Sequence, residues 1–168
     1  SAMTTSNPTY GPNPAVNGQY EGDRQIYYLR SNLALAPGQN LLMGLERRNE
    51  AMTSETAYSE VDASTGDTGV YGEFQGSIGE RFFGAANIRY DDDDTFGDHT
   101  TFRLAPAILF PETGTKLKAS YGTGFKAPSL YQLYAPYYGN ADLKPEESTG
   151  YDAGFEQELW GGRVTFGT

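Results

Sequence analysis

Apolar and polar residues alternate one by one along several segments, and this period of two is the feature that most limits how the chain can fold. The clearest case covers residues 70–78, where Val70, Phe74 and Ile78 share one side with glycines, and Glu73 and Gln75 lie on the other. Successive side chains of a β-strand point to opposite sides of the sheet. The segment is therefore predicted to be a strand between an apolar and a polar environment.

The same alternation predicts about eight strands and no long helix. They are expected at residues 25–36, 41–46, 70–78, 82–90, 102–110, 116–121, 151–159 and 163–166. Many are near the roughly 9–11 residues with which a tilted strand crosses a bilayer. We predict an all-β, antiparallel up-and-down meander of the outer-membrane β-barrel type, either a small closed barrel or part of a larger one.

The expected connections alternate between short and long. Short turns are predicted at residues 36–39, 79–81, 111–114 and 160–162, and long polar loops at residues 48–68, 91–99 and 122–148. Outer-membrane barrels combine short periplasmic turns with longer extracellular loops. The three long loops are therefore expected to face the outside of the cell.

Composition excludes several classes of function. The formal net charge of -10 would repel nucleic acid, and the absence of cysteine rules out disulfides, thiolate metal sites and a cysteine nucleophile. None of the common hydrolase or phosphate-binding motifs occurs, and His99 beside Asp98 is interpreted as a turn histidine in an acidic loop. We predict that the chain is not an enzyme.

Residues 1–22 differ from the rest. Residues 1–3 look like the remnant of a cloning tag, and the following stretch contains three prolines and several glycines, which are typical of irregular chain. We therefore expect a tag remnant and an irregular lead-in over residues 1–22, and a β-barrel segment over residues 23–168.

Several motifs in the second half resemble TonB-dependent outer-membrane receptors, especially the vitamin B12 receptor branch. The resemblance covers most of residues 70–168, whereas residues 25–69 share only the general strand-and-turn pattern of a barrel. It rests on residues 88–92, 96–97, 100–101, 124–128, 130–134, 139–140 and 143–146, which read IRYDD, FG, TT, GFKAP, LYQLY, GN and LKPE.

This resemblance implies import of a metal chelate of the cobalamin or siderophore class across the bacterial outer membrane. The family's barrel has about 22 strands, is closed by an N-terminal plug and is driven by contact with the TonB protein. No segment here matches the plug or its TonB-contacting box, and the chain stops before the family's C-terminal strands. We expect a fragment that is not transport-competent alone and that needs a lipid bilayer or detergent.

Two other classes of function are open. A self-contained eight-stranded outer-membrane protein could serve adhesion or structure, because eight strands can close a small barrel. A water-soluble, lipocalin-like binder would need its apolar face turned inward. If the sheet stays open, its unpaired edges should recruit further strands, and the chain should self-associate.

A run of acidic residues suggests a calcium site, while no other cofactor is required. Carboxylate oxygens suit calcium, and some receptors of the resembled branch use acidic extracellular loops for this ion. A solvated acidic loop is the alternative interpretation. The candidate ligands are Asp91, Asp92, Asp93 and Asp94, with Asp98 nearby.

Tyrosines gather in the last long loop, together with Pro128 and Pro136. Such a rigid aromatic surface could stack on a flat chelate or macrocycle. Alternatively, the rings pack the loop against its own barrel mouth. The candidate ligand-binding residues are Tyr131, Tyr134, Tyr137 and Tyr138.

Overall fold

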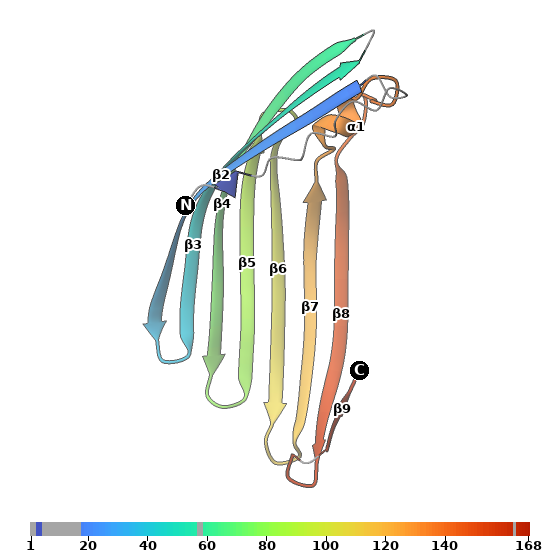
Figure 1. The fold of residues 1–168 in the computed structure, drawn as a ribbon. Helices are drawn as coiled ribbons and strands as arrows, with labels where there is room; N and C mark the ends of the chain where they lie inside the picture. Colours follow the sequence, from blue (N-terminus) through green and yellow to red (C-terminus); the bar gives the residue numbers. More distant parts are fainter. Residues whose placement is uncertain (1–2, 5–17, 57–58, 163) are drawn as a thin grey trace.

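The computed structural model describes residues 3–4, 18–56, 59–162 and 164–168, and shows a nine-stranded antiparallel sheet. Its strands follow one another in sequence order, so the predicted up-and-down meander is confirmed (Figure 1). The strands are β1 (Met3–Thr4), β2 (Gly18–Ala36), β3 (Gln39–Thr56), β4 (Glu60–Ile78), β5 (Phe82–Asp93), β6 (Gly97–Phe110), β7 (Thr115–Lys126), β8 (Glu146–Leu159) and β9 (Val164–Gly167).

The eight predicted strands correspond to β2–β9, and the four short turns lie where they were expected. The lead-in is shorter than predicted, because β2 already begins at Gly18 and pairs with β3 from there. Met3 and Thr4 also pair with β2. The expectation for residues 1–2 and 5–17 lies outside the described residues.

The predicted long loop at residues 48–68 is wrong. β3 and β4 stay in register from Arg47↔Thr68 to Glu55↔Glu60, so most of this stretch is a strand hairpin. Both faces of the hairpin carry polar residues, and alternation therefore gave no signal. The loop at residues 91–99 shrinks to a turn at residues 94–96, and the loop at residues 122–148 loses both ends to β7 and β8.

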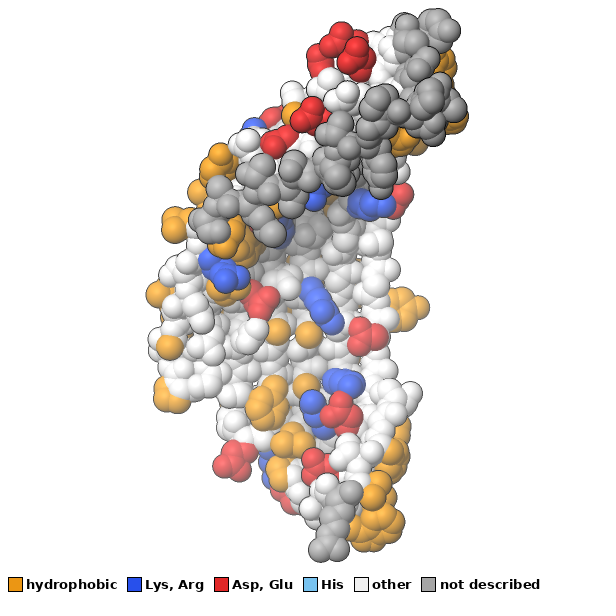
Figure 2. Space-filling model, in the orientation of Figure 1, with side chains coloured by type: hydrophobic (Ala, Val, Ile, Leu, Met, Phe, Trp, Pro, Cys, Tyr) orange, Lys and Arg blue, Asp and Glu red, His pale blue; other side chains and the backbone are white. Residues whose placement is uncertain are grey.

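The register gives the sheet an apolar face and a polar face. Leu45, Val70 and Tyr90 are direct neighbours on the apolar face. Figure 2 looks onto the hollowed polar face, where charged side chains run down the middle while hydrophobic side chains project at the margins. Large exposed side chains of the apolar face are Leu29, Leu45, Val70, Phe74, Ile78, Phe82, Ile88, Leu104, Leu117, Tyr121 and Phe155. An apolar surface of this extent suits lipid.

The described sheet does not close on itself. β1 lies at one end of the strand order and β9 at the other, and no pairing joins these two edges within the described residues (Figure 1). The structure therefore agrees with part of a larger barrel and differs from the small closed barrel. An open sheet also has no enclosed apolar interior, which the lipocalin-like alternative requires.

One short helix, α1 (Leu130–Tyr134), lies on the polar face against β3 and β4. It begins with a capping box: the Ser129 hydroxyl accepts a hydrogen bond from the Gln132 N–H, and the Gln132 side chain accepts one from the Ser129 N–H. Leu130 and Leu133 are buried together with Met52 of β3, which makes a small core beneath the helix.

Within the described part of the chain, no helix is long and apolar enough to cross a membrane.

Candidate functional site

Charged side chains of β2–β5 meet on the polar face at the end of the sheet that carries α1. Alternation along β3 turns Glu46, Arg48 and Glu50 toward this face, and the register places Arg48 opposite Asp67 of β4. The next strand contributes Arg89 and Asp91, also at alternate positions. The cluster therefore follows from period two combined with antiparallel pairing.

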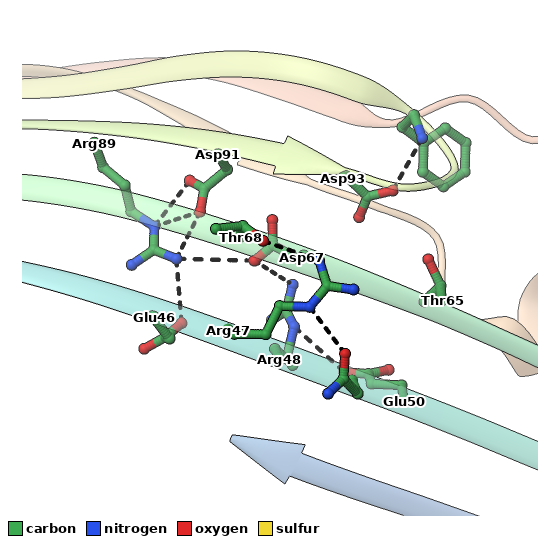
Figure 3. A network of polar contacts seen from close by, with 12 residues as sticks. Glu46, Arg47, Arg48, Glu50, Thr65, Asp67, Thr68, Arg89, Asp91 and Asp93 are labelled. Carbon is green, nitrogen blue, oxygen red and sulfur yellow. Dashed lines mark hydrogen bonds and ion pairs between the residues drawn. The ribbon is translucent and has the colours of Figure 1, made fainter. Parts of the chain in front are cut away.

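Arg89 contacts three carboxylates at one end of the cluster (Figure 3). Its Nη2 atom is 2.6 Å from Asp91 Oδ1 and 3.1 Å from Glu46 Oε1, and thereby links β5 to β3. The guanidinium crosses β4 above Gly69, where an added Cβ would lie only 2.2 Å from Arg89 Nη2. A residue without a side chain is required at this crossing.

Arg48 and Arg24 extend the cluster toward β2. Arg48 Nη2 lies 3.3 Å from Asp67 Oδ2, and Arg48 Nε lies 3.6 Å from Glu50 Oε1. Arg24 Nε is 2.9 Å from the same Glu50 oxygen. The seven connected residues are called the charge ladder: Arg24, Glu46, Arg48, Glu50, Asp67, Arg89 and Asp91.

The carboxylates at the core of the ladder are almost out of contact with water. The side chain of Asp67 is 6% exposed and that of Asp91 is 8% exposed. Burial, and then the charge of Asp91, raise the pKa of Asp67, while Arg48 and Arg89 oppose that rise. Asp67 lies beyond Val70, the last apolar outward residue of β4, and thus outside the membrane-spanning part of the strand.

A cavity of about 500 Å³ lies between the charge ladder and the segment that carries α1. His99 and Phe125 line it, with their rings stacked at a centroid distance of 3.3 Å. His99 Nε2 is 3.8 Å from Asp91 Oδ2. The interpretation of His99 as a turn residue is wrong, because it lies within β6 and faces the ladder.

The structure does not bring the four candidate calcium ligands together. Asp91 pairs with Arg89, Asp93 Oδ1 accepts the N–H groups of Thr95 and Phe96, and Asp94 Oδ2 is 3.1 Å from Arg47. Asp91 and Asp93 are buried while Asp92 is exposed, because neighbours in a strand point to opposite faces. No group of three or more potential ligands surrounds a common point in the described residues.

Calcium binding at Asp91–Asp94 therefore stays a prediction. Calcium titration of the unsubstituted chain and of the Asp92→Asn and Asp94→Asn variants tests it. Heat release that both variants lose would support the site, and a titration without heat would contradict it.

The four candidate tyrosines lie at the end of the sheet opposite the short turns, and all of them are exposed. Tyr131 makes an edge-to-face contact with Tyr20 of β2, with ring centroids 5.5 Å apart, beside a second cavity of about 260 Å³. Tyr137 and Tyr138 are 78% and 83% exposed. The two buried leucines of α1 hold this segment against the sheet, so the ring surfaces stay available. A ligand role for the tyrosines stays a prediction.

The charge ladder was not predicted from the sequence. Arg48 and Asp67 are 19 residues apart, and the loop predicted over residues 48–68 kept them out of any strand pair. A usable signal did exist in the acidic and basic residues at alternate positions of residues 46–50 and 89–91. Matching these segments required the register.

Comparisons with known proteins agree with the fold. A family model described as "TonB dependent receptor-like, beta-barrel" matches residues 2–168. The vitamin B12 transporter BtuB of Vibrio cholerae serotype O1 is 37% identical over 113 residues, covering 67% of this chain and 18% of that protein. The chain thus spans less than a fifth of the length of this curated relative.

Two solved structures from Pseudomonas aeruginosa are also similar. A mutant of the ferric enterobactin receptor PfeA superimposes with a TM-score of 0.77 at 20% identity, over 89% of this chain and 26% of that one, and shows the fold alone. The siderophore receptor PirA gives a TM-score of 0.69 at 26% identity, over 84% of this chain and 29% of that one. On this family match and architecture, the chain belongs to the β-barrel family of TonB-dependent receptors, which lie in the bacterial outer membrane.

Proposed function

We propose that this chain is a section of the barrel wall of a receptor that imports a metal chelate of the cobalamin or siderophore class, powered through TonB. The observation that carries the proposal is the 37% identity over 113 residues with a vitamin B12 transporter. The function is binding and passage without bond chemistry, so the proposal includes no enzymatic activity. In the longer receptor, the polar face lines the lumen and the apolar face meets lipid.

The exposed tyrosine segment supports the proposal. Tyr137 and Tyr138 follow Pro136, and Tyr137 has a φ of 68°, a left-handed conformation that is uncommon for residues other than glycine. The neighbouring helix is fixed by its buried leucines and its capping box. This end of the sheet therefore presents aromatic rings from an anchored base, which suits stacking on a flat macrocycle or on aromatic groups of a chelate.

Binding measurements on the receptor that carries this segment test the proposal. We expect cyanocobalamin or a ferric siderophore to bind the purified receptor in detergent, and its affinity to fall about 2- to 10-fold in each of Tyr137→Ala and Tyr138→Ala. Trp160→Ala is the matched control, because Trp160 is 75% exposed and lies in a turn at the opposite end.

The possible failures can be told apart. If neither class of chelate binds, the proposed substrate class is wrong. If a chelate binds but its affinity is the same in both tyrosine variants and in the control, the wall assignment stands and the role of the tyrosines is wrong.

A further inference from the structure

A groove of about 460 Å³ runs across β4, β5 and β6 on the apolar face, near the ends that join the short turns. Its floor is formed by Gly76, Gly84 and Pro106, which the register places side by side on neighbouring strands. None of the three projects a long side chain. The Phe74 ring lies over Gly76, where an added Cβ would be 2.6 Å from it, so the hollow is open at Gly84 and Pro106 and is closed by this ring on β4.

Bulky side chains border this floor on both sides. Phe74 and Leu104 rise on the side of α1, while Ile78 and Phe82 rise on the side of the turns. The surface at Gly84 is open, because the nearest atom to an added Cβ would be 3.9 Å away. The groove is thus an apolar hollow between two bulky rows.

The strand that carries Pro106 is irregular at the same place. Pairing between β6 and β7 runs to Leu104↔Tyr121 and resumes only at Ala107↔Lys118. Proline lacks the N–H that a central strand uses, and it is normally confined to edges and bulges. The groove therefore coincides with a local interruption of the sheet. A larger, strand-favouring residue in place of Pro106 would have filled the groove.

Lipid covers this face in the outer membrane, and the groove lies in the half of the wall nearest the short turns, which are periplasmic in such barrels. The inner leaflet there consists of phospholipid. We propose that the groove binds one acyl chain of an inner-leaflet phospholipid, held between the two bulky rows. A void in this wall would forfeit dispersion contacts, and a hydrocarbon chain restores them without any polar partner.

Two glycine variants separate this site from the general lipid-facing surface. Gly84→Leu fills the groove. Gly72→Leu is the matched control, because Gly72 lies on the same face outside the groove, and its nearest neighbour is also 3.9 Å from an added Cβ. The receptor that carries this segment is purified from outer membranes in mild detergent, and retained phospholipid is counted by native mass spectrometry.

We expect Gly84→Leu to lower the retained phospholipid about 2- to 5-fold, because several carbon–carbon contacts of roughly 0.1–0.2 kcal/mol each are lost, with Gly72→Leu equal to the unsubstituted receptor. If Gly84→Leu does not assemble, Gly84→Ala should give a smaller loss in the same direction. Equal retention in the Gly84 and Gly72 variants, equal loss in both, or lipid A as the bound species would each overturn the proposal.

Discussion

Replacing Arg89 by methionine removes a guanidinium that lies 2.6–3.9 Å from carboxylates on three strands. The apolar stem is kept, so the change acts on the charge. Truncating one partner of a buried ion pair costs roughly 3–5 kcal/mol, because the other charge is left unpaired. The side chains of Arg89 and Glu46 are 31% and 28% exposed, so water screens part of this loss. We expect the free energy of unfolding to fall by about 2 kcal/mol.

Urea unfolding of the chain in phospholipid vesicles, followed by circular dichroism, measures this loss. Arg103→Met is the control, because within the described residues Arg103 has a single side-chain hydrogen bond, to Ser120 at 3.3 Å, and the change should cost less than about 0.5 kcal/mol. Adding Asp91→Asn to Arg89→Met should recover part of the stability by removing the stranded charge. The reasoning is refuted if Arg89→Met costs no more than the control, or if the double variant loses the sum of the single losses.

Three further predictions follow from the same geometry. Gly69→Ala should displace the Arg89 guanidinium and cost about 1–2 kcal/mol by the same unfolding measurement, whereas Gly72→Ala should be nearly neutral; equal effects would contradict the close crossing. Because the pKa of Asp67 is raised in the folded state, its stabilisation is complete below the ordinary value of 3.8 and is lost as the pH rises through the raised pKa. Asp67→Asn should therefore lose less stability than the unsubstituted chain as the pH rises above the ordinary pKa of 3.8, and parallel pH profiles would contradict this. The chain alone should form dimers or larger species through its open edges when it is cross-linked in detergent, and a clean monomer would argue against accessible edges.

The membrane-facing parts of the strands could be predicted from the sequence because two environments act on them. Residues 70–78 alternate since one side meets lipid and the other meets the polar interior, and the structure confirms this strand. The tight turns could be predicted for a different reason, because they contain glycines at positions that need a positive φ. Gly38 and Gly114 have φ values of 74° and 67°, which glycine adopts without strain. Local sequence therefore carried both the strand pattern and the turns.

The candidate site needed information that local sequence does not carry. Residues 48–68 are rich in Ser, Thr, Asp and Glu, so composition favoured a loop, while cross-strand hydrogen bonds hold them as strands. The contact of Arg48 with Asp67 depends on a register that no single segment reveals. The helix Leu130–Tyr134 is too short to show a helical period. These features depend on tertiary pairing.

The row Leu45–Val70–Tyr90 marks a change in what stabilises the sheet. On the turn side of this row most outward residues are apolar, and lipid covers them in place of a second protein layer. Beyond it the outward face carries Arg47, whose guanidinium binds Thr68 and Asp94, so water replaces lipid there. At this level the sheet is stabilised on its polar face, by the charge ladder and by the core under α1. Substitutions in the charge ladder should therefore alter the stability of the extracellular end without affecting lipid retention. Filling the groove at Gly84 should leave chelate binding unchanged.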